Sequence, residues 1–79
     1  MLLKEIRPIE VKKELFEVLV DVWDKVGDVG ERWYCTEKFT TYAFDYEDAE
    51  ERAIDYLRVK YPEKFNKLVI VNSLNKGAF

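Results

Sequence analysis

Residues 15–30 read LFEVLVDVWDKVGDVG, and this run predicts the first half of a β-hairpin. In its first part, apolar side chains alternate along one face: Phe16, Val18, Val20 and Val22. Two glycines and an aspartate then fall within residues 26–30, which is typical of a hairpin loop. We therefore expect a strand over residues 15–25 whose alternating apolar face lies against the core.

The segment after the loop, residues 31–44, predicts the second strand of the hairpin. It is long enough to contain a β-bulge, which we place near Glu37 and Lys38. The side chains expected to point to the core are Trp33, Cys35, Phe39 and Ala43. Those expected to point outward are Tyr34, Lys38, Thr40 and Tyr42.

The clearest local signal begins at Asp45, which has the character of a helix N-cap followed by first-turn acids. Apolar residues then recur at spacings of three and four: Tyr46, Ala49, Ala53, Tyr56 and Leu57. Asp48 and Arg52 form a favourable i,i+4 pair, and Pro62 ends the helix near Tyr61. These features predict one amphipathic helix.

A third strand is predicted over residues 67–74, with Leu68, Ile70 and Leu74 on one face and Val69 and Val71 on the other. Residues 75–77 are expected to form a turn or a frayed end, and residues 1–14, which include Pro8, predict an N-terminal arm or edge strand. The expected fold is α+β in two layers. An antiparallel β-hairpin is followed by one amphipathic helix and a last strand (β-β-α-β) in a single domain over residues 1–79.

The amino-acid composition excludes several classes of partner and of catalytic site. The net charge is −3 with acids and bases interspersed, so we expect no duplex nucleic acid as a partner. The absence of histidine removes the serine and cysteine triads and the usual zinc sites. A single cysteine and an N-terminus without a long apolar run predict a reducing compartment, no membrane span and a cytoplasmic location, the host cytoplasm if the protein is viral.

No residue pattern predicts catalysis, a metal or a cofactor. The acids of residues 45–55 are explained by the helix cap and a solvated helix face. Cys35 lies mid-strand without a histidine to activate it and is interpreted as a small buried hydrophobe. Gly27 and Gly30 precede a strand rather than a helix, which favours a hairpin over a phosphate loop. We therefore expect no enzyme.

The face of the sheet away from the helix is the candidate binding site. In a two-layer domain this face is ordinarily polar, but here it is predicted to be aromatic and aliphatic. The candidate residues are Leu19, Trp23, Tyr34, Tyr42, Val69 and Val71. Such a patch is typical of a partner surface or a homo-oligomer contact. Two alternatives stay open: residues 1–11 fold across this face, or a one-residue register slip exchanges the two faces.

The chain from Leu15 onward resembles a group of short, uncharacterised domains of phages and mobile elements. The resembling features are the strand at residues 15–20, the glycine hairpin, and residues 42–50, which read YAFDYEDAE. The resemblance implies an accessory protein without known catalysis. The expected function is therefore a non-enzymatic, phage-type inhibitor or modulator of a host protein, such as a defence protein, acting by steric occlusion. The alternative is a single-stranded nucleic-acid or nucleotide binder that stacks bases on the same rings.

Overall fold

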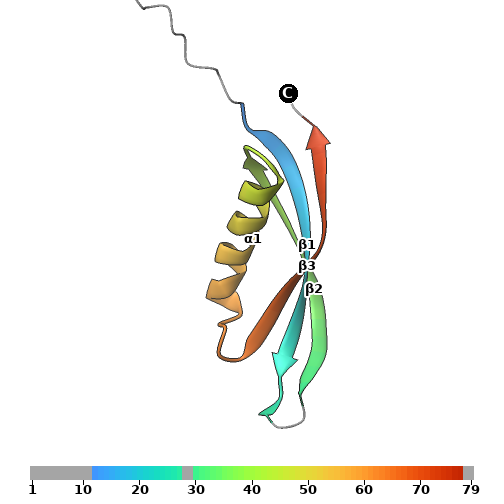
Figure 1. Ribbon diagram of the computed structural model, residues 1–79, viewed down its shortest axis with the longest axis vertical. Coiled ribbons are helices and arrows are strands. Elements are labelled where there is room, and N and C mark those ends of the chain that lie inside the picture. The colour runs from blue at the N-terminus through green and yellow to red at the C-terminus, as the bar shows by residue number, and fades with distance from the viewer. Residues whose placement is uncertain (1–11, 28–29, 78–79) are drawn as a thin grey trace, which may run out of the picture.

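The computed structural model describes residues 12–27 and 30–77, which form an α+β fold (Figure 1). The elements follow the order β1 (Glu14–Lys25), β2 (Glu31–Ala43), α1 (Tyr46–Lys60) and β3 (Asn66–Gly77). The predicted β-β-α-β order is therefore confirmed. The predicted arm lies outside the described residues as far as Val11, and its last residue, Glu14, is the first residue of β1.

Strand β1 lies in the middle of the sheet, which has the order β2-β1-β3. Both neighbours run antiparallel to β1, so β2 and β3 are parallel to each other. Helix α1 connects these two outer strands and lies along one face of the sheet (Figure 1). No described element covers the opposite face.

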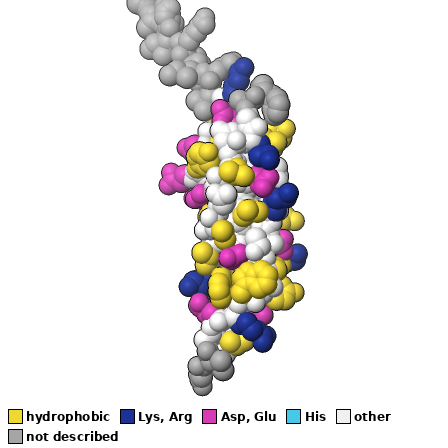
Figure 2. Space-filling model, turned by 90° about the vertical axis from the view of Figure 1, so that its right-hand side faces the viewer, with side chains coloured by type: hydrophobic (Ala, Val, Ile, Leu, Met, Phe, Trp, Pro, Cys, Tyr) yellow, Lys and Arg dark blue, Asp and Glu magenta, His cyan; other side chains and the backbone are white. Residues whose placement is uncertain are grey.

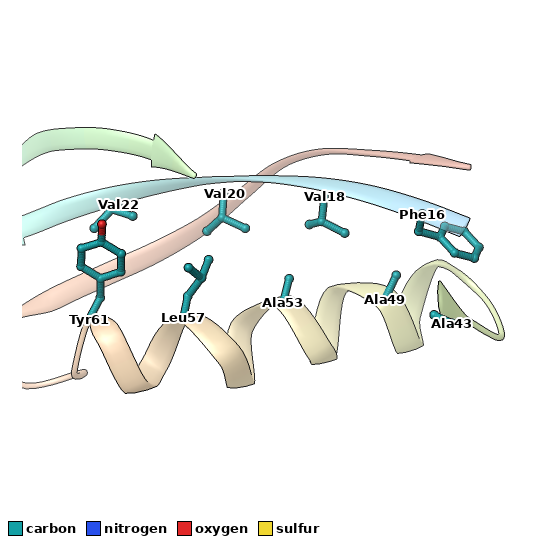
Figure 3. Close-up of a cluster of buried hydrophobic side chains, with 9 residues drawn as sticks. All are labelled: Phe16, Val18, Val20, Val22, Ala43, Ala49, Ala53, Leu57 and Tyr61. Carbon is teal, nitrogen blue, oxygen red and sulfur yellow. The ribbon is translucent and has the colours of Figure 1, made fainter. Parts of the chain in front are cut away.

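The core lies between β1 and α1 (Figure 3). The four alternating apolar side chains of β1 are each at most 1% exposed: Phe16, Val18, Val20 and Val22. They point to the helix, and Ala49, Ala53 and Leu57 of the helix pack against them. The two alanines let the helix backbone approach the valines closely. Burying one valine or phenylalanine is worth about 1.5–3 kcal/mol, so the four side chains of β1 supply a substantial part of the hydrophobic stabilisation.

Both ends of α1 are capped as the sequence predicts. Asp45 accepts a hydrogen bond from the backbone nitrogen of Asp48 at 2.7 Å. The Asp48 carboxylate in turn accepts from the backbone nitrogen of Phe44 and pairs with Arg52 at 3.1 Å. The Phe44 N–H first, and then Arg52, lowers the pKa of Asp48. At the other end the Tyr61 N–H donates to the carbonyl of Leu57, and Pro62 follows.

The strand registers correct two predictions on β2. The irregularity between β1 and β2 lies at Val22 and Trp23, not near Glu37 and Lys38. It pairs Val22 with Cys35 but Trp23 with Trp33. Because directly opposite residues share a face, Trp33 lies on the face away from the helix, where the uninterrupted alternation had placed it in the core.

Two similar corrections concern β3. Its register shifts between Leu19 and Val20, so Ile70 lies opposite Val20 while Leu74 lies opposite Glu17. Leu74 is therefore on the opposite face from Leu68 and Ile70, not on the same one. The strand also continues to Gly77, where a turn or a frayed end over residues 75–77 was expected. Asn75 remains in the sheet because it pairs with Phe16.

Candidate functional site: the outer sheet face

The sheet face away from α1 is called the outer face. Its members follow from the register, because directly opposite residues share a face. On β1 they are Leu15, Glu17, Leu19, Asp21 and Trp23; on β2 they are Trp33, Thr36, Lys38, Thr40 and Tyr42; on β3 they are Lys67, Val69, Asn72 and Leu74. Figure 2 views the molecule from this side. Hydrophobic side chains lie along its whole length, between acidic and basic ones.

Two tryptophans lie together at the hairpin end of the outer face. Trp23 is half-buried, and Trp33, directly opposite on β2, is 52% exposed. The indole Nε1 of Trp33 donates to the Asp21 carboxylate at 3.4 Å, and the Thr36 hydroxyl donates to the same oxygen at 2.6 Å. Asp21 thus fixes one edge of the Trp33 ring, and about half of the residue stays exposed.

The other end of the outer face exposes a second apolar group. Tyr42, opposite the half-buried Leu15, is 56% exposed, and Leu74 on β3 is 43% exposed. Between the two ends lies Leu19, half-buried, with Lys38 on one side and Asn72 on the other. The apolar residues therefore occupy both ends and the centre of the face, and polar residues separate them.

The structure brings most of the predicted site residues together. Leu19, Trp23, Tyr42 and Val69 lie on the outer face. Val71 is the extra residue of the β3 irregularity; it is exposed and has no opposite residue on β1.

Tyr34 is the exception. Its ring contacts Tyr61 edge-on, with 6.2 Å between centroids, so its predicted place on the outer face is wrong. The bulge beside Trp23 turns Tyr34 toward the end of α1 and turns Trp33 outward. Counting back from the pair Lys25–Glu31, which closes the hairpin loop, places Trp33 opposite Trp23. The register set by the hairpin loop therefore predicts the outward position of Trp33, which simple alternation along β2 does not.

The outer face carries charged side chains of both signs. The acids Glu17 and Asp21 lie on the central strand and Glu31 lies on β2, and the bases Lys38 and Lys67 lie on the two flanking strands. Glu17 pairs with Lys76 at 3.4 Å, and Lys67 pairs with Glu31 at 3.3 Å. Within residues 12–27 and 30–77, neither Lys38 nor Asp21 makes an ion pair.

A polar cluster lies on the other side of the sheet, where β2 meets the end of α1. The Tyr61 hydroxyl donates to Glu37, which also accepts from Lys60 at 3.0 Å. The Cys35 sulfur lies 3.6 Å from the same hydroxyl. The Tyr61 hydrogen bond and then Lys60 lower the pKa of Glu37, while the bond to Glu37 raises the pKa of Tyr61.

These shifts are the reverse of what acid–base catalysis needs. A general base requires a carboxylate with a raised pKa, and a general acid requires a phenol with a lowered one. Here the carboxylate is held charged and the phenol is held neutral. We therefore assign the cluster to fastening α1 onto β2.

Residues 12–27 and 30–77 lack the features of a metal site, a pocket or a membrane span. Its acidic and cysteine side chains form no group of three or more that would hold a metal ion. No pocket opens between its side chains. Helix α1 lacks the length and apolar character to cross a membrane.

The chain was compared with protein-family models, with curated proteins and with solved structures, and no match was found in any of the three comparisons.

Proposed function

We propose that this chain is a non-enzymatic protein-binding domain and that the outer face is its contact surface. The observation that carries the proposal is the exposure of Trp33 and Tyr42 on a face that α1 leaves uncovered. Tryptophan and tyrosine dominate the energetics of protein interfaces because they bury large area at little cost in side-chain entropy. The ordinary outer face of a two-layer domain is polar, so these rings serve a partner.

The partner we propose is a host protein, and the chain acts on it as an accessory factor of phage type in the host cytoplasm. Its mechanism is steric occlusion: the sheet covers a functional surface of the partner and needs no chemistry of its own. The resemblance of residues 15–20 and 42–50 to phage domains supports this proposal. So does the presence of exposed rings beside charges of both signs on the outer face, since protein interfaces contain both apolar and polar groups.

An affinity pull-down with the chain as bait tests the proposal. We expect a specific protein to be retained at moderate and at high salt, because buried rings are insensitive to screening. Trp33→Ala and Tyr42→Ala should each reduce retention about tenfold or more, as the loss of an interface anchor does. Phe65→Ala is the matched control, since Phe65 is an equally exposed ring in the turn after α1.

Two results would contradict the proposal. Retention unchanged in both variants would move the site away from the outer face. Tryptophan quenching by a single-stranded oligonucleotide, lost between about 50 and 200 mM salt, would instead indicate base stacking on the same rings.

A further inference from the structure

Trp33 and Asp21 place an aromatic ring and a carboxylate side by side at the hairpin end of the outer face. Oδ1 of Asp21 accepts from the Trp33 indole at 3.4 Å and from the Thr36 hydroxyl at 2.6 Å. The other carboxylate oxygen, Oδ2, accepts no hydrogen bond from residues 12–27 or 30–77. Trp33 is 52% exposed and Asp21 is half-buried. The pair therefore offers an exposed ring beside an oxygen that can still accept a hydrogen bond.

This combination suits one kind of side chain. The face of an indole ring attracts a cation within about 6 Å of its centre, and a carboxylate forms its strongest hydrogen bonds with a cationic donor. The guanidinium group of arginine meets both requirements, because it is planar, stacks on aromatic rings and donates from its edge. We propose that Trp33 and Asp21 bind an arginine side chain of the partner protein, stacked on the ring and donating to Oδ2. The inference rests on the proposed function and names what the partner presents to the outer face.

Two lysines lie near Asp21 but do not take the place of this arginine. They are its diagonal neighbours in the sheet, Lys67 opposite Trp23 and Lys38 opposite Leu19. Lys67 pairs with Glu31 at 3.3 Å, and Lys38 makes no ion pair with any of the described residues. Lys38 can reach toward Asp21 and compete for it. Its compact, strongly hydrated ammonium has no planar face, however, so it leaves the Trp33 ring uncovered.

The same pair disfavours a nucleotide as the occupant. A base stacked on Trp33 would bring its phosphate near the Asp21 carboxylate, and like charges oppose that contact. Sites that stack single-stranded nucleic acid combine their rings with a positively charged groove. The hairpin end of the outer face therefore favours a basic segment of a protein over nucleic acid.

The indole N–H resonance of Trp33 in a proton–nitrogen NMR spectrum tests the site; it is identified by its loss in Trp33→Phe. Titration of the full chain with N-acetyl-arginine amide, up to about 100 mM, should shift this resonance to saturation. We expect a dissociation constant in the millimolar range, because one side chain makes few contacts. N-acetyl-citrulline amide has the same shape without the charge and should bind at least about tenfold more weakly. N-acetyl-lysine amide, at matched ionic strength, should also bind more weakly than arginine.

One substitution isolates the charge of Asp21. Asp21→Asn keeps an oxygen for the Trp33 and Thr36 donors, so the ring stays in place, and arginine binding should weaken at least about fivefold. The control is Asp55→Asn, the same change at an exposed position of α1, which should bind as the unaltered chain does. Lys38→Ala removes the competing cation and should bind arginine at least as tightly. Circular dichroism confirms that each variant folds.

Three results would overturn the arginine site. The first is a Trp33 resonance that arginine does not shift. The second is binding of citrulline, or of adenosine monophosphate, as tight as that of arginine. The third is a folded Asp21→Asn that binds arginine as the unaltered chain does.

These failures are separable from failure of the proposed function. In the pull-down, N-acetyl-arginine amide should release the retained protein where the citrulline compound does not, and Asp21→Asn should reduce retention severalfold. A protein that Asp21→Asn retains fully, through Trp33 and Tyr42, removes only the arginine contact. Arginine binding by a chain that retains no protein removes only the host-protein role.

Discussion

Tyr61 joins three neighbours at the end of α1. Its hydroxyl donates to Glu37 and lies near Cys35, and its ring meets Tyr34 edge-on. Tyr61→Phe keeps the ring and removes only the hydroxyl. We expect it to lower the free energy of unfolding by about 1–2 kcal/mol, because Glu37 loses a hydrogen bond to a charged acceptor. Urea denaturation at pH 7 measures this, with Tyr56→Phe, an exposed tyrosine of α1, as the control.

The pH dependence of stability should change in the same variant. Glu37 has a folded pKa below its ordinary 4.5, so its contribution is present above that pH and is lost as the pH falls. Tyr61 has a folded pKa raised above its ordinary 10.0, so its contribution is present below that pH and is lost as the pH rises further. Denaturation from pH 3 to 11 should therefore show flatter acidic and alkaline limbs in Tyr61→Phe. Limbs identical to those of the unaltered chain would show that the hydroxyl does not hold Glu37.

Single residues were predictable from the sequence where their neighbours in the chain determine them. Asp48 and Arg52 are four apart on one helix, so their ion pair could be predicted without knowledge of the rest of the fold. Trp33 and Tyr34 are different, because which ring points outward depends on one inserted residue opposite Val22 and Trp23. An aromatic side chain can lie on either face of the sheet. The residue types of Trp33 and Tyr34 therefore could not show which of the two points outward.

At the scale of the element, α1 depends strongly on its first turn. It buries only Ala49, Ala53 and Leu57, which is a small apolar surface for a fifteen-residue helix. The cap at Asp45 therefore matters. We expect Asp45→Ala to lower the free energy of unfolding by about 1 kcal/mol, the usual value of a lost N-cap. Urea denaturation followed by circular dichroism measures it.

The control for the cap is Asp55→Ala, which removes an exposed carboxylate from the same helix outside its first turn. An equal loss in both variants would assign the effect to helix charge rather than to the hydrogen bond from the Asp48 N–H.

Helix and strands differed in how well the sequence predicted them. The ends of α1 follow from Asp45 and Pro62, which act on the chain within one turn. The strands were placed to within a residue or two except at the end of β3. The predicted orientation of the side chains was wrong beyond each register shift, at Trp33 and Leu74. A bulge depends on how the strand pairs with β1, and the local sequence does not determine it.

At the scale of the whole molecule, the buried core and the proposed binding surface lie on opposite faces of one sheet. The buried residues of β1 and α1 lie on the helix side, and the exposed rings of Trp33 and Tyr42 lie on the other. The two properties should therefore respond to different substitutions. We expect Leu57→Ala, at a side chain that is 2% exposed, to cost about 2–4 kcal/mol of unfolding free energy. Tyr42→Thr, on the outer face, should cost less than about 1 kcal/mol, since threonine suits a strand and little buried area is lost.

Paired measurements on these two variants test the separation. Urea denaturation gives stability, and the pull-down gives partner retention. Leu57→Ala should retain the partner at temperatures where it remains folded, because its outer face is unchanged. Tyr42→Thr should lose retention while its urea midpoint stays near that of the unaltered chain. If Tyr42→Thr instead destabilises the fold as much as Leu57→Ala does, the outer rings belong to a second core, and their exposure would no longer favour a partner-binding role.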